Sequence, residues 1–219
     1  AIVLVIIGLL LGGVLKGQEL INTARVRALN NTVDGITAAW FSFQDRYRAF
    51  PGDYTQATVN LPDPDGLIAD GNGDGQVATD AERSNVWVQL QAAGYVTGNY
   101  DAGAVAADQY GCSVNTCPDN GFGSGMNLSF GTEIRGATAT TSNAHELISG
   151  RGIPVEVVAE LDRKVDDGEP ESGAMQLGAG SANGWSAVES GLCRRDDAGD
   201  IVYELQSPSA NCAAVFRNF

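Results

Sequence analysis

The first fifteen residues of the chain, AIVLVIIGLLLGGVL, contain no charged side chain and none that forms hydrogen bonds. A membrane-spanning helix needs about 20 such residues, so this segment is shorter than a full span. A signal peptide has an apolar region of this length, but it ends at a small-residue cleavage site, whereas here a helical pattern continues. Such a segment can bury its whole circumference only in lipid or among other helices like it.

The residues that follow have the pattern of an amphipathic helix. No proline interrupts residues 1–50, and Pro51 with Gly52 ends the pattern. A helix over these residues would be a rod of roughly 70 Å. A two-helix coiled coil is an alternative, although the apolar stripe lasts only about three heptads. We expect the stripe to anchor the rest of the chain through six residues three or four apart: Leu29, Val33, Ile36, Trp40, Phe43 and Tyr47.

Three glycines, Gly12, Gly13 and Gly17, lie within six residues where the two halves of this helix meet. Each glycine costs roughly 1 kcal/mol of helix propensity relative to alanine. We therefore predict that the helix bends or locally unwinds here. Close packing of small residues between apolar helices is the alternative interpretation.

The remainder of the chain is strongly acidic. The 219 residues suffice for one ordinary domain, and 27 acidic against 13 basic side chains give a net charge of −14. Residues 1–50 carry five basic and three acidic side chains, a sum of +2, so residues 51–219 carry −16. We expect an N-terminal helix over 1–50, apolar in 1–15 and amphipathic in 16–50, and an acidic globular head over 51–219. Nucleic-acid binding is not expected of this charge.

The head has signals for both helices and strands. Thr79 and Glu82 form a capping-box signature before a predicted helix over 80–93, which Gly94 would end. A second helix is predicted over 154–164. Candidate strands lie at 127–134, 174–177, 201–205 and 213–216. The predicted fold class is α+β, in which the long helix packs against a small antiparallel sheet. Residues 95–125 are predicted to form an extended surface loop.

Four cysteines, Cys112, Cys117, Cys193 and Cys212, allow three disulfide pairings. Proximity favours pairing each cysteine with its neighbour in sequence, and the second of these disulfides would stabilise the C-terminal loop by roughly 3 kcal/mol. A zinc site is the alternative, but the sequence has no C-x-x-C pair and only one histidine, His145. Disulfides would imply an oxidising compartment.

An acidic loop, DGNGDGQV, matches the first half of an EF-hand calcium loop. Asp70, Asn72, Asp74 and the carbonyl of Gln76 supply oxygen at the expected spacing. The closing glutamate of that motif would stand at position 81, but this residue is alanine, with Asp80 and Glu82 on either side. Calcium binding is therefore a hypothesis beside a second interpretation, a solvated Asn/Asp/Gly turn that leads into a helix.

No pattern in the sequence indicates catalysis. His145-Glu146 lacks the second histidine of a zinc-protease helix, and no Walker loop or nucleophile elbow occurs. We expect His145 to lie at the surface or in a turn. The acidic pairs at 166–167 and 196–197 are interpreted as turns rather than as an acid/base pair. We therefore predict that the chain is not an enzyme and has no catalytic residues.

The N-terminal sequence AIVLVIIGLLLGGVLKGQELI resembles the mature N-terminal segment of type IV pilins and pseudopilins. Members of that family carry an aromatic first residue and a glutamate before this apolar run, and Ala1 corresponds to a position just inside it. Four head segments are similar to a large-headed subgroup of pilin-like proteins: FQDRYRAFPGDY, GNGDGQV, VWVQLQAAGYVTG and ELDRKVDDGEPESG.

The resemblance implies a pilin fold and a structural role. The chain would be a major pilin that polymerises with copies of itself into an extracellular filament, after anchoring in the lipid bilayer of the inner membrane and meeting an assembly machinery there. A minor pilin, a type II secretion pseudopilin or a membrane-anchored surface-binding protein are alternatives. No cofactor is required, and Ca²⁺ is possible. The residues expected to form the filament core are Ile2, Val3, Leu4, Val5, Ile6, Ile7, Leu9, Leu10 and Leu11.

Overall fold

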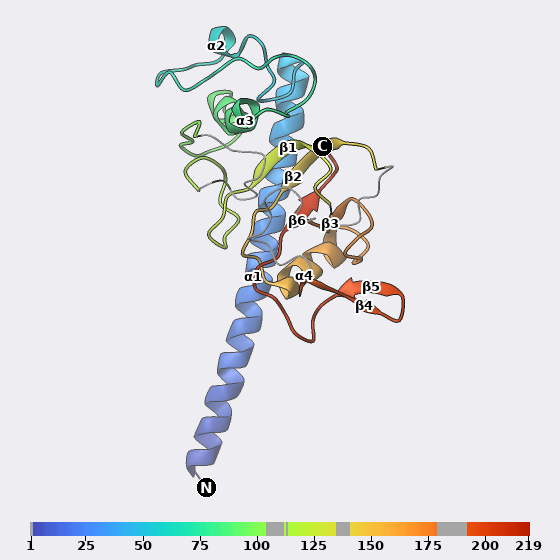
Figure 1. Cartoon of the computed structure of the whole chain (residues 1–219). Helices are drawn as coiled ribbons and strands as arrows, with labels where there is room; N and C mark the ends of the chain where they lie inside the picture. The colour runs from blue at the N-terminus through green and yellow to red at the C-terminus, as the bar shows by residue number, and fades with distance from the viewer. Residues whose placement is uncertain (1, 104–111, 113, 135–140, 179–191) are drawn as a thin grey trace.

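The computed structural model describes residues 2–103, 112, 114–134, 141–178 and 192–219. It has a long N-terminal helix and a small antiparallel sheet, which confirms the predicted α+β class (Figure 1). Helix α1 (Ile2–Tyr47) has 46 residues and a length of about 70 Å. Its amino-terminal half projects from the head, and its carboxyl-terminal half lies against it. Within the described residues, no helix has the combined length and apolar character that a membrane span requires.

The main sheet has four antiparallel strands in the order β1-β2-β6-β3. These are β1 (Asn127–Gly131), β2 (Ala144–Ile148), β6 (Ala214–Phe216) and β3 (Met175–Leu177). Strands β4 (Arg194–Asp197) and β5 (Asp200–Tyr203) form a separate hairpin, whose two turn residues, Ala198 and Gly199, both have positive φ. Such a turn suits the right-handed twist of a two-residue hairpin.

The described residues of the head contain three further helices. Helix α2 (Ala57–Asn60) is a single turn, α3 (Asp80–Ala92) begins at a capping box on Thr79, and α4 (Val155–Val165) follows Pro154. The predicted helices over 80–93 and 154–164 are thus confirmed within one residue at each end. Helix α1 packs mainly on α4 and also on α3.

The core lies along one face of the carboxyl-terminal half of α1. Four of the six residues proposed as anchors are under 4% exposed, Val33 is 4% exposed, and Tyr47 is half-buried at the edge of the core. Val26 is the first buried residue among the described side chains of the helix. The head covers α1 from that point onward. The buried face comprises Val26, Leu29, Val33, Ile36, Ala39, Trp40 and Phe43.

Both disulfides join neighbouring cysteines, Cys112 to Cys117 and Cys193 to Cys212. The prediction that residues 95–125 form an extended surface loop falls partly outside the described residues, and where the segment is described it does not lie wholly at the surface. Cys112, Cys117 and Tyr100 are all buried, because the disulfide and the tyrosine ring pack against the core. The second disulfide links the residue before β4 to Cys212, two residues before β6, and so holds the β4–β5 hairpin near that strand.

His145 is buried, and the expectation that it lies at the surface or in a turn is wrong. It lies in β2, a strand that the sequence did not predict, and is 6% exposed. Its ring centroid lies 4.5 Å from that of Phe50 and 5.1 Å from those of Trp40 and Phe130. Burial lowers the pKa of His145 from 6.5 to about 4, so the ring is neutral at pH 7. In that state its Nε2 accepts the Val77 N–H at 3.4 Å.

This depressed pKa predicts that His145 destabilises the head on acidification. The unfolded chain binds the proton near pH 6.5 and the folded chain only near pH 4, so stability is lost as the pH falls through that window. Each pH unit there is worth about 1.4 kcal/mol. We therefore expect the difference in unfolding free energy between the natural chain and His145→Gln to shrink steadily from pH 6.5 to pH 4.5 in urea titrations. A difference that does not change with pH would contradict this assignment.

Candidate functional site

The amino-terminal half of α1 presents apolar side chains that no described part of the head covers. Five described side chains there are between 47% and 64% exposed: Ile7, Leu10, Val14, Leu20 and Ile21. Positions 7, 10, 14 and 21 follow one another at helical spacing and therefore lie on one face. Exposed apolar surface of this extent marks a site of protein or membrane interaction. Of the nine residues expected in the filament core, only Ile7 and Leu10 have described side chains, and both are exposed.

Helix α1 is continuous through Gly12, Gly13 and Gly17. The structure therefore has no local unwinding at these glycines, and a bend there stays a prediction. Nothing lies within 4 Å of the position where a Cβ would stand on any of the three glycines. Within the described residues they have no packing partner, so close packing at these positions would require another chain.

The acidic loop is built around Asp53, a residue that the calcium-loop pattern does not include. Asp53 is 3% exposed. Its Oδ1 accepts the Gly73 N–H at 2.6 Å and its Oδ2 accepts the Gly75 N–H at 2.9 Å. Gly71 passes so close that a Cβ there would lie 2.2 Å from the Asp53 carbonyl carbon. The Gly-rich segment 71–75 therefore folds around the Asp53 carboxylate and donates two backbone N–H groups to it.

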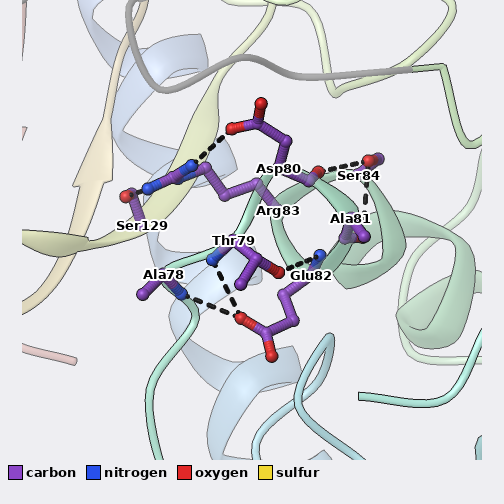
Figure 2. A network of polar contacts seen from close by, with 8 residues as sticks. All are labelled: Ala78, Thr79, Asp80, Ala81, Glu82, Arg83, Ser84 and Ser129. Atoms are coloured by element: carbon purple, nitrogen blue, oxygen red, sulfur yellow. Dashed lines mark hydrogen bonds and ion pairs between the residues drawn. The ribbon is translucent and has the colours of Figure 1, made fainter. Parts of the chain in front are cut away.

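Glu82 lies at the start of α3, where its side chain points back to Ala78 and Thr79 (Figure 2). Its Oε2 accepts the N–H groups of Ala78 and Thr79, at 3.1 and 2.9 Å, and the Thr79 hydroxyl accepts the Glu82 N–H at 3.2 Å. This reciprocal capping box accounts for the position of the glutamate, because its side chain must reach back to the first turn of α3. Oε1 accepts the Asn72 N–H at 3.4 Å, so the same side chain also contacts the acidic loop.

The fold gathers only part of the residue set suggested by the sequence. One carboxylate oxygen from each of Asp53, Asp74 and Glu82 lies within 4.8 Å of the others. Two of the other suggested residues have partners elsewhere: Asp70 accepts hydrogen bonds from Thr58, and Asp80 forms an ion pair with Arg83 in the first turn of α3. The other two contact Asp74, because Asn72 donates its side-chain amide and Gln76 its backbone N–H to the Asp74 carboxylate. Three carboxylates that converge in this way could supply part of the oxygen ligands of a hard cation.

Asp53 was missed because it lies 17 residues before Asp70, outside the motif. The only available signal was its place in the FPGDY segment, directly after a Pro-Gly turn. Asp53, Gly73 and Gly75 also line an open pocket of about 310 Å³ beside Gln44 and Arg48 of the α1 end. The acidic loop is thus accessible from solvent at the junction of α1 and the head.

Two other acidic side chains are buried away from this loop. Burial raises the pKa of Glu146 to about 7, against the opposing effects of the Glu133 N–H and of Arg217, whose Nε lies 2.9 Å from Oε1. Burial also raises the pKa of Asp162 to about 6, although Tyr203 donates a hydrogen bond to it. Glu146 of β2 contacts Arg217, which follows β6, and Asp162 of α4 contacts Tyr203 of β5.

No protein-family model, curated protein or solved structure matches this chain. Functional inference therefore depends on the chain's own sequence and geometry. The coarse arrangement, a long N-terminal helix packed with a small antiparallel sheet, fits a pilin-like fold.

We predict that calcium binds at the acidic loop through Asp74 rather than through Asp70. With a dissociation constant near 1 mM, 10 mM Ca²⁺ would stabilise the full chain by about 1.4 kcal/mol, or about 4 °C in Tm. Asp74→Asn should reduce the calcium-dependent rise in Tm relative to chelator. Asp70→Asn is the matched control and should leave the rise unchanged, because Asp70 lies outside the group formed by Asp53, Asp74 and Glu82 and its carboxylate is bonded to Thr58. Equal rises in all three chains would show that this loop does not bind calcium.

Proposed function

We propose that this chain is the major structural subunit of a type IV pilus-like filament. The amino-terminal half of α1 would be anchored in the inner membrane before assembly and would then pack with copies of itself in the filament core. The head would face outward, outside the cell. The role proposed is structural and not catalytic, and the partners are copies of the chain and an inner-membrane assembly machinery.

The observation that carries this proposal is the division of α1 into a covered and an uncovered half. From Val26 onward the head buries one face of the helix, whereas the described apolar side chains before it are exposed. Removing apolar surface from water is worth about 25 cal/mol per Å². Ile7, Leu10 and Val14 therefore favour any state in which lipid or neighbouring helices cover them.

A helical polymer follows when every subunit uses the same contacts. Head-to-tail contacts between identical chains that rotate by a fixed angle without closing generate an open helix. Residues 51–219 carry a net charge of −16, so neighbouring heads repel one another. Packing of the apolar helices must exceed this repulsion. Bound cations at the heads would reduce it.

We expect filament assembly to fail when the exposed apolar stripe of α1 is trimmed. The triple variant Ile7→Ala, Leu10→Ala and Val14→Ala removes contact surface but keeps the helix apolar and uncharged. In cells that carry it in place of the natural gene, the filament yield in the sheared surface fraction should fall at least tenfold. The membrane-bound level and the Tm of the head should be unchanged, because these side chains do not touch the head.

The matched control trims three exposed apolar residues of the head. Val59→Ala, Leu192→Ala and Leu205→Ala remove comparable side chains that are 80%, 59% and 45% exposed. This variant should assemble normally. Normal filaments from the α1 variant would contradict the proposed core. Filaments composed of a different chain, with this one at the tip or absent, would assign it instead as a minor pilin or pseudopilin.

A further inference from the structure

Three aspartates gather at the carboxyl-terminal end of α4. Asp162 lies in its last turns, and Asp166 and Asp167 follow the helix directly. One carboxylate oxygen of each lies within 4.8 Å of the other two. The carboxyl end of a helix carries partial negative charge, so cations and not carboxylates stabilise it. This arrangement is electrostatically unfavourable unless positive charge compensates it.

Asp162 is the buried member of the cluster. Its side chain is 0% exposed, and the Tyr203 hydroxyl of β5 donates to Oδ2 at 2.7 Å. Oδ1 is buried and, within the part of the chain that the structure describes, makes no hydrogen bond of ordinary geometry, although the Gly168 backbone N–H acts on the same carboxyl group. Burying a charged oxygen without a partner is costly. Lys164 pairs with Glu160, and within the described residues no basic side chain forms an ion pair with Asp162.

The turn after α4 brings the other two carboxylates over Asp162. Asp166 Oδ2 accepts the Met175 N–H at 2.9 Å, and Asp167 accepts the Glu169 N–H at 2.9 Å and the Ser172 hydroxyl at 2.7 Å. Gly173, with φ of +77°, passes so close that a Cβ would lie 2.0 Å from Asp166 Oδ2. A carboxylate can accept about four hydrogen bonds, so each of these still has free lone pairs.

We propose that Asp162, Asp166 and Asp167 bind a calcium ion. The donors are carboxylate oxygens, which suit a hard cation, and three of them on a surface turn suit the adaptable coordination of Ca²⁺. Mg²⁺ is a poorer fit, because it keeps most of its waters and is held by one or two carboxylates. The ion would supply the missing partner of Asp162 Oδ1 and positive charge at the end of α4.

The bound ion would connect three parts of the head. Asp162 belongs to α4, the turn from Asp166 leads into β3, and Tyr203 holds the β4–β5 hairpin to Asp162. This site is separate from the acidic loop at the start of α3, because the two clusters share no residue. The proposed calcium site consists only of head residues, so the proposal does not depend on whether the chain forms filaments.

The test is thermal unfolding of the full chain with chelator and with 10 mM Ca²⁺, in an Asp74→Asn background that weakens the acidic loop. With a dissociation constant near 1 mM, calcium should raise the folding equilibrium constant about tenfold. Asp162→Asn should abolish this rise. Without calcium its Tm should equal or exceed that of the parent, because the amide keeps an oxygen for Tyr203 but carries no buried charge.

Two further variants separate binding from folding. Asp167→Asn changes an exposed side chain and should reduce the calcium-dependent rise in Tm; because Asp167 also accepts two hydrogen bonds in the turn, the rise is measured from the variant's own chelator Tm. Asp200→Asn, an exposed aspartate of β5, is the control with the same change of charge and should keep the full effect. No calcium effect in the Asp74→Asn parent, or an undiminished effect in Asp162→Asn and Asp167→Asn, would overturn the proposal. An equal effect with 10 mM Mg²⁺ would overturn the assignment to calcium.

Discussion

Burial of one face of α1 is the interaction on which the rest of this structure depends. Trp40 and Phe43 are fully buried and are among the largest side chains of the core, and both come from this helix. The small sheet alone could not enclose such a core, because two of its four strands have only three residues. The head is therefore built on the helix, and the helix continues beyond it as a rod whose described apolar side chains are exposed.

Carboxylates organise the loops that complete the head. Asp53 fixes segment 71–75 through two backbone N–H groups, and Glu82 caps α3 and reaches the same loop. Asp162 joins α4 to the β4–β5 hairpin through Tyr203. Such side chains replace the regular backbone bonds that a loop-rich chain lacks. They also concentrate negative charge at two places, which is why both are candidate cation sites.

The sequence predicted the elements whose signals are local. The unbroken helical pattern of residues 1–50, the capping box at Thr79 and the pairing of neighbouring cysteines each depend on short-range chemistry. Strand β2 was missed because its residues His145 and Glu146 look solvent-exposed, and both are buried by distant partners, the aromatic rings around Trp40 and the Arg217 side chain. Asp53 and the cluster around Asp162 were missed for the same reason. Their neighbours are fixed by tertiary packing, which a single sequence does not specify.

The most direct test of the central claim, that the bare half of α1 is a filament core, is cryo-electron microscopy of filaments sheared from the source cells. The account predicts that every repeat contains this chain, identified by side-chain density for Trp40 and Trp87, with Ile7, Leu10 and Val14 in contact with neighbouring helices on the axis. Such a map would also show whether Gly12–Gly17 unwinds on assembly. A map in which this chain repeats but its amino-terminal helix lies outside the core would contradict the account.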